Sequence, residues 1–128
     1  MILIVEGPID VATVLASVQT ERAGGVVHFI GTVRQDGDIT GLHYECYPEM
    51  AQQRMADLAE AATRRLGLEK VSAVHRVGWV PLGEVAVVIA VSSAHRAEAF
   101  EGCRWMIDQI KQEAPIWKKD GTGCCACS

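Results

Sequence analysis

The chain has 128 residues, of which 49% are hydrophobic, and this is enough apolar material for one core and one domain. The formal net charge of -4 argues against a broad nucleic-acid-binding surface, because such surfaces carry an excess of Lys and Arg that neutralises phosphates. Any anion site must therefore be a local pocket.

Two further features indicate the compartment. No apolar run reaches the length that spans a bilayer, and residues 1–6 lack the basic start and cleavage pattern of a signal peptide. The five cysteines are an odd number without the spacing of a disulfide framework, which is typical of free thiols in a reducing environment. We therefore expect a cytoplasmic protein.

The N-terminal part of the chain predicts three strands and one helix. The apolar run over residues 2–5 predicts an edge strand, and apolar residues at helical spacing over residues 11–18 predict a short helix. The β-branched run over residues 26–34 predicts a central strand that ends in Arg34. Residues 39–47 alternate between the two faces of a strand, and the glycine turn before them predicts a hairpin with the preceding strand.

A long helix and two strands are predicted next. Pro48 suits the first position of a helix that Gly67 ends. Strands are predicted over residues 70–77 and 84–92, and the continuous apolar run of the second is typical of a buried strand. A turn over residues 79–83 joins them. The helix is predicted to bury the stripe Ala51, Met55, Leu58 and Ala62.

The last predicted helix lies within residues 91–119. Small hydroxyl residues that can cap a helix precede it, and Pro115 forbids regular helix beyond it. The order of elements predicts one α+β domain with helices packed on a mixed or largely antiparallel sheet. The predicted apolar face of this helix contains Phe100, Cys103, Met106, Ile107 and Ile110.

Cations lie at both ends of this helix. His95 and Arg96 at its start oppose the helix dipole, which suggests an external anion. Lys111 and Lys118 lie on either side of Pro115, so a reversal of the chain there can bring both ammonium groups to one rim. A desolvated lysine near a second cation has a lowered pKa and can transfer protons near neutral pH.

Other polar residues have a structural interpretation beside the functional one. Arg34 at a strand end can point into a cleft, although an arginine there is more often simply exposed. His75 and Arg76 are adjacent on a strand, so one is expected to pack inward while the other meets water. Trp117 can stack on a planar ligand or seal the core, and the core role is the more common one.

Several kinds of site lack support. No two histidines lie four residues apart, and the terminal cysteines lack a second ligand pair at zinc spacing, so no metal is expected. Phosphate loops of the Walker or dinucleotide type are absent. Ser93, His95 and Asp108 offer the residue types of a hydrolase triad, but no nucleophile elbow supports one.

Five sequence blocks run in order along the chain: HFIGTVR (28–34), YECYPEM (44–50), VHRVG (74–78), VSSAHRAEAFEGCRWMIDQIK (91–111) and APIWKK (114–119). Together they closely resemble the large, catalytic subunit family of molybdopterin synthase. The resemblance implies a domain of the α/β hammerhead type over residues 1–119, followed by a short, atypical Cys-rich tail over residues 120–128.

The same resemblance implies an enzyme that transfers sulfur during molybdenum cofactor biosynthesis. The sulfur is expected to come from the C-terminal thiocarboxylate of a small ubiquitin-like partner that ends in Gly-Gly. The acceptor is expected to be cyclic pyranopterin monophosphate, which becomes the dithiolene of molybdopterin. The resemblance also implies a dimer of large subunits with a small subunit at each end. It implies no cofactor.

Site residues follow from the same match. The resemblance implies that two lysines surround the reacting pterin, that a cationic cluster binds its phosphate, and that two apolar residues form the pocket wall. Part of the cationic cluster, His95 and Arg96, is expected to reach the site from the opposite large subunit. The seven residues are Lys111 and Lys118, then Arg34, His95 and Arg96, then Phe29 and Met106.

The C-terminus departs from the family pattern, because TGCCACS stands where a tryptophan-bearing tail is usual. Two alternatives stay open. One is a sulfur carrier with a persulfide on Cys124, Cys125 or Cys127. The other is a module of the same fold that binds the partner and the pterin phosphate without making the dithiolene.

Overall fold

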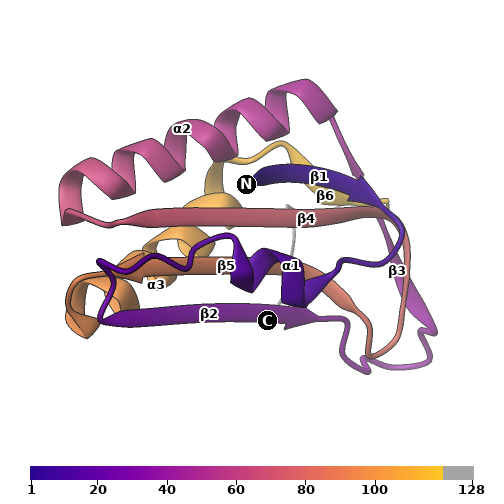
Figure 1. Ribbon diagram of the computed structural model, residues 1–128. Coiled ribbons are helices and arrows are strands. Elements are labelled where there is room, and N and C mark those ends of the chain that lie inside the picture. Colours follow the sequence, from indigo (N-terminus) through magenta and orange to yellow (C-terminus); the bar gives the residue numbers. More distant parts are fainter. Residues whose placement is uncertain (120–128) are drawn as a thin grey trace.

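The computed structural model describes residues 1–119, which form a mixed six-stranded sheet and three helices (Figure 1). The predicted α+β class with helices packed on a mixed sheet is confirmed. The predicted tail over residues 120–128 lies outside the described residues. The elements are β1 (Ile2–Glu6), α1 (Val11–Ala16), β2 (Gly25–Thr32), β3 (Gly41–Cys46), α2 (Pro48–Leu66), β4 (Lys70–Pro81), β5 (Val85–Ser93), α3 (Arg96–Glu113) and β6 (Ile116–Lys118).

The sheet is organised around its longest strand, β4. The strand order is β2-β5-β4-β3-β6, and β1 pairs with β4 beside this path. Only the pairing of β1 with β4 is parallel among the described strands. The first part of β4 pairs with β5 and β1, whereas β3 pairs with it from Gly78 onward. Gly78 has a φ of 85°, which glycine adopts without strain, so the strand changes partners at a residue that permits a bend.

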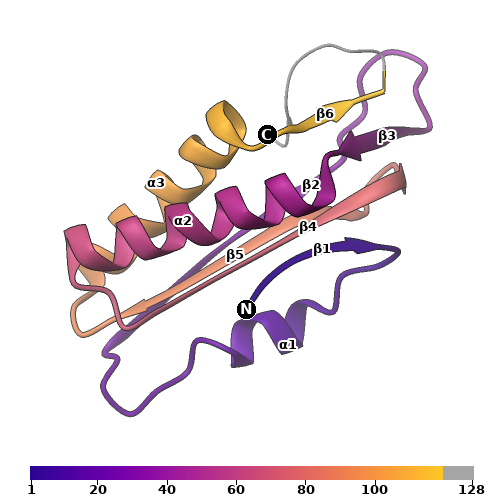
Figure 2. The same cartoon turned by 90° about the horizontal axis from the view of Figure 1, so that it is seen from above.

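Helices cover both faces of the sheet (Figure 2). The main core lies on the side of α2 and α3 and contains Met55 and Met106, whereas a smaller core packs Val14 of α1 against the other face. Side chains of β5 enter both cores alternately: Ile89 lies in the main core and Val88 in the smaller one. The prediction of a strand buried on both faces is therefore confirmed.

The prediction for α2 is also confirmed. Pro48 is its first residue, and Gly67 ends it in the left-handed conformation with a φ of 65°. Residues at a spacing of three or four face the core because a helix turns once every 3.6 residues, at about 100° per residue. The predicted stripe is buried in full: Ala51, Met55, Leu58 and Ala62.

The predicted place of β2 is wrong. It lies at the end of the strand order and not in the centre, and its burial alternates along its length. The predicted hairpin of residues 26–34 with 39–47 is also wrong, because β3 pairs with β4 and β6. The segment after β2 and the segment before β3 bind the turn between β4 and β5 and do not pair with each other. The Val33 carbonyl accepts a hydrogen bond from the Gly83 N–H, and the Thr40 carbonyl accepts one from the Leu82 N–H.

The start of α3 differs from the prediction as well. The serines Ser92 and Ser93 are buried in β5, and the N-cap residue is His95, whose side chain makes no capping hydrogen bond. Phe100 is 63% exposed, while Ala99 and Gly102 take the inward positions of this turn. The inward face is thus offset from the predicted one at the start of the helix, although its later residues are buried as predicted.

Candidate functional site

Lys111 lies in the last turn of α3 and is half-buried. The helix ends at Glu113 because Ala114 already has extended backbone and Pro115 has no N–H to donate. The chain then enters β6, which pairs with β3. The prediction that Pro115 marks the end of the helix is confirmed.

Lys118 lies in β6 directly opposite Tyr44 of β3. Opposed residues of an antiparallel pair share one face of the sheet, and Tyr44 is buried in the main core. The Lys118 side chain therefore leaves the strand on the core face, and it is half-buried at the margin of the main core. Trp117 lies on the other face, where its ring centroid is 5.1 Å from that of Tyr47. The indole therefore packs against a side chain of this chain, but it does not seal the main core as the structural interpretation of Trp117 expected.

Arg34 follows β2 and is exposed. The preceding residue, Val33, is buried, and both of its backbone polar groups bind the turn between β4 and β5. Figure 2 shows α3 running in the same direction as β2. Arg34 and Lys111 therefore lie toward the same end of the molecule, together with β6.

His95 and Arg96 are exposed at the other end of α3. This end packs closely on the start of β2, because a Cβ added to Gly25 would lie 3.1 Å from the Arg96 Cα. An eight-residue strand separates Gly25 from the region of Arg34, and such a strand spans roughly 25 Å. A single chain therefore does not bring together the predicted anion-binding cluster.

The arginines differ in whether they have partners. Five of the eight form ion pairs with carboxylates, and the Arg65 guanidinium carbon lies 5.3 Å from the centroid of the Trp105 ring. Within residues 1–119, Arg34 and Arg96 remain without an ion-pair partner or an aromatic ring beneath them. Their charges are therefore available to an external anion.

The two predicted pocket-wall residues are placed differently. Met106 is fully buried in the main core, whereas Phe29 is half-buried in β2 and packs against that core. Met106 therefore offers no exposed surface to a ligand in one chain. Phe29 is the more accessible of the two.

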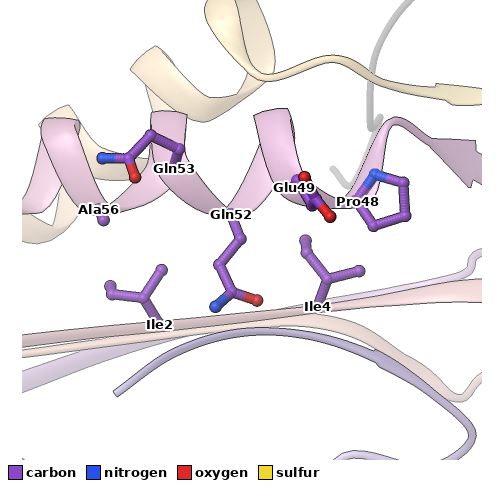
Figure 3. A pocket seen from close by; sticks show the side chains of 7 residues that line it. All are labelled: Ile2, Ile4, Pro48, Glu49, Gln52, Gln53 and Ala56. Atoms are coloured by element: carbon purple, nitrogen blue, oxygen red, sulfur yellow. The ribbon is translucent and has the colours of Figure 1, made fainter.

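Several cavities lie along α2, and two of them flank its N-terminal half. One of about 360 Å³ lies between β1 and the start of α2, and in Figure 3 the side chain of Gln52 points between Ile2 and Ile4. A second of about 610 Å³ lies between α2 and the connection from α3 to β6, where Arg54 forms an ion pair with Glu113. None of the seven predicted site residues lines either cavity.

The described thiols are poorly suited to nucleophilic chemistry. Burial raises the pKa of Cys103 to about 11, and it raises the pKa of Cys46 as well. Both thiols are therefore mostly protonated at neutral pH, and the thiolate is the reactive form. The persulfide alternative depends on Cys124, Cys125 and Cys127, which lie outside the described residues.

The environment of Arg76 differs from the one predicted from the sequence. His75 and Arg76 are both buried, although one was expected to meet water. The Arg76 Nη1 donates to Glu84 Oε1 at 2.8 Å, and its Nη2 donates to the Trp79 carbonyl at 3.2 Å. The available signal was the pair of opposite charges that flank the predicted turn.

The part of the chain that the structure describes holds no helix long and apolar enough to cross a membrane. Across the same residues, no three side chains from His, Cys, Asp or Glu are grouped so as to hold a metal ion.

Known proteins resemble the chain in sequence and in fold. The model of the MoaE protein family matches residues 4–113. The molybdopterin synthase catalytic subunit of Thermoplasma volcanium is 46% identical over 120 residues, which cover 91% of this chain and 88% of that protein. The crystal structure of molybdopterin synthase from Staphylococcus aureus matches with a TM-score of 0.86 and 34% identity, covering 95% of this chain and 94% of the other.

A third match is a complex of subunits 1 and 2 of the molybdopterin-converting factor from Helicobacter pylori. The TM-score is 0.78 at 27% identity, and the match covers 91% of this chain and 81% of the other. The fold and the sequence thus define one class, the catalytic subunits of a molybdopterin-forming enzyme. The chain belongs to the MoaE protein family. The family and the enzyme class predicted from the sequence are confirmed.

Proposed function

We propose that this chain transfers sulfur from the thiocarboxylated C-terminus of a small ubiquitin-like subunit to cyclic pyranopterin monophosphate, and so forms the dithiolene of molybdopterin. The observation that carries the proposal is the family match over residues 4–113. The Helicobacter pylori complex, in which a relative is bound to a second subunit, supports a protein partner.

Lys118 and Lys111 are proposed to supply the proton transfers and to stabilise oxyanions as the thiocarboxylate sulfur attacks the pterin side chain. Both lysines are half-buried, so their ammonium groups are partly shielded from water while remaining accessible. Neither forms an ion pair within residues 1–119. A carboxylate partner would favour the charged form and oppose proton release.

Arg34, His95 and Arg96 are proposed to bind the phosphate of the pterin. A guanidinium presents a planar fork of donors that fits phosphate oxygens, and both arginines are exposed without a competing carboxylate among the described residues. They lie at opposite ends of β2, however, so one chain cannot direct both at one phosphate.

A dimer resolves this separation. Among the described strands, β2 pairs only with β5, which leaves its other edge open. Exposed Val26 (46%) and Ile30 (37%) lie on the face of β2 that the main core does not cover. A two-fold pairing of β2 with β2 of a second chain would be antiparallel, and it would bring Arg34 of one copy toward Arg96 of the other. We propose this dimer as the active arrangement.

The test is single-turnover conversion of cyclic pyranopterin monophosphate with thiocarboxylated partner. Lys118→Ala should lower the rate by on the order of 100-fold or more, because general acid–base groups contribute that much. Lys119→Ala is the matched control: the residue is adjacent and exposed, and its backbone N–H, which donates to the His43 carbonyl at 2.7 Å, is retained. A near-normal rate for Lys118→Ala would show that the proposed role is wrong.

A further inference from the structure

The buried guanidinium of Arg76 joins two sides of a turn. Its side chain is only 9% exposed, yet it donates to the Glu84 carboxylate and to the Trp79 carbonyl. Its Nε is buried without a hydrogen-bond partner among the described residues. A buried charge is rarely the most stabilising choice for its position, so what distinguishes this residue is the geometry that it imposes.

The turn that Arg76 braces comprises residues 82–84 and connects β4 to β5. Trp79 precedes the turn and Glu84 closes it, so one rigid fork of donors holds both sides. Glu84 also accepts, through its backbone carbonyl, a hydrogen bond from the Val33 N–H at 3.1 Å. The side chain and the backbone of the same residue therefore link Arg76 to the segment after β2.

The braced turn holds both ends of the loop over residues 33–40. Gly83 donates its N–H to the Val33 carbonyl at 2.7 Å, and Leu82 donates to the Thr40 carbonyl at 3.0 Å. The ring of Trp79 lies against the residue after the loop, because a Cβ added to Gly41 would be 2.5 Å from the Trp79 Cζ2. The loop is thus anchored to the two segments that Arg76 joins.

Arg34 is the first free side chain of this loop. Val33 is buried and bound through both backbone groups, so the turn determines where the Arg34 Cα lies. We infer that Arg76 is a positioning residue for Arg34: together with Glu84 it holds the turn that directs the Arg34 guanidinium toward the anionic group of the substrate. This inference rests on the proposed function, in which Arg34 binds the pterin phosphate.

The structural half of the test is amide hydrogen exchange followed by NMR, with the Ile89 amide of β5 as the internal reference. Glu84→Ala removes the partner of Arg76 at a half-exposed side chain, so the variant should fold. We expect the Val33 and Gly83 amides to exchange about tenfold faster relative to Ile89. Val74→Ala changes a core residue of β4, the strand that also carries Arg76, and should leave these ratios unaltered. Unaltered ratios in both Glu84→Ala and Arg76→Met would overturn the inference.

The functional half is a double-mutant cycle on the dissociation constant for cyclic pyranopterin monophosphate. Glu84→Ala should weaken binding about three- to tenfold in the native background and have no further effect beside Arg34→Ala. At saturating substrate its kcat should stay native, because Arg76 acts on binding through Arg34. If Glu84→Ala weakens binding by the same factor in the Arg34→Ala background as in the native one, the inference is overturned.

The two halves separate this inference from the proposed function. If Arg34→Ala weakens binding while Glu84→Ala does not, the positioning role is wrong and the proposed function stands. If Arg34→Ala itself leaves the dissociation constant unchanged, phosphate recognition by Arg34 is wrong, and the effect of Arg76 on the substrate is overturned with it.

Discussion

Arg34 and Arg96 stand at opposite ends of β2 in one chain. Arg96 packs against Gly25 at the start of the strand, and Arg34 follows its last residue, Thr32. They are also the two arginines of residues 1–119 that lack both a carboxylate partner and an aromatic ring beneath the guanidinium. If both bind one substrate, two chains must build the site.

The edge of β2 should therefore be the dimer contact. Ile30→Lys places a charge on this edge strand, which is exposed in the single chain. In the proposed dimer the ammonium would be buried without a partner, which is strongly unfavourable, so the variant should be a monomer. Analytical ultracentrifugation measures the change. Leu3→Lys on the edge strand β1 changes an equally exposed residue and should leave the mass unaltered. A dimer that persists with Ile30→Lys would place the contact elsewhere.

Arg34→Ala should weaken binding of the substrate without unfolding the chain. Loss of a charge-assisted hydrogen bond costs about 1.5–3 kcal/mol, which corresponds to roughly a 10- to 100-fold increase in the dissociation constant. Isothermal titration calorimetry with cyclic pyranopterin monophosphate measures this dissociation constant. Arg64→Ala removes an exposed arginine paired with Glu60 within α2 and is the control for net charge. Equal affinities for the two variants would contradict phosphate binding by Arg34.

Cys103 should make stability depend on pH in the alkaline range. Burial raises its pKa from 9.0 to about 11, so the folded state favours the protonated thiol. This contribution is complete below pH 9 and is lost as the pH rises toward 11; the loss between pH 8 and 10.5 is about 2 kcal/mol. Urea unfolding at both pH values, compared with Cys103→Ala, isolates it. An equal loss in both proteins would contradict the effect.

Much of the fold could be predicted from the sequence because its elements bury regular stripes. The stripe of α2 from Ala51 to Ala62 and the continuous apolar run of β5 are both local patterns that the structure confirms. The edge position of β2 could not be predicted, since β-branched residues indicate a strand without naming its neighbours. The glycine turn after β2 indicated a hairpin, but long-range bonds of Val33 and Thr40 to the next turn override it.

In the candidate site, the two lysines could be found from the sequence, but the relative positions of the arginines could not. Lys111 and Lys118 stood out because a proline separates them near a helix end, and both are half-buried in the structure. The distance between Arg34 and Arg96 depends on how β2 and α3 pack, which no local pattern records. The burial of Arg76 depends on Glu84 across a turn, so it also appears only in three dimensions.

Mixing two variants, each of which lacks one proposed site residue, tests the central claim most directly. Arg96→Ala and Lys118→Ala chains are combined under conditions that exchange subunits, and formation of molybdopterin is then measured with thiocarboxylated partner. If each site takes Lys118 from one chain and Arg96 from the other, random exchange should restore about a quarter of the native sites. A mixture no more active than its two components would contradict a sulfur-transfer site shared between two chains.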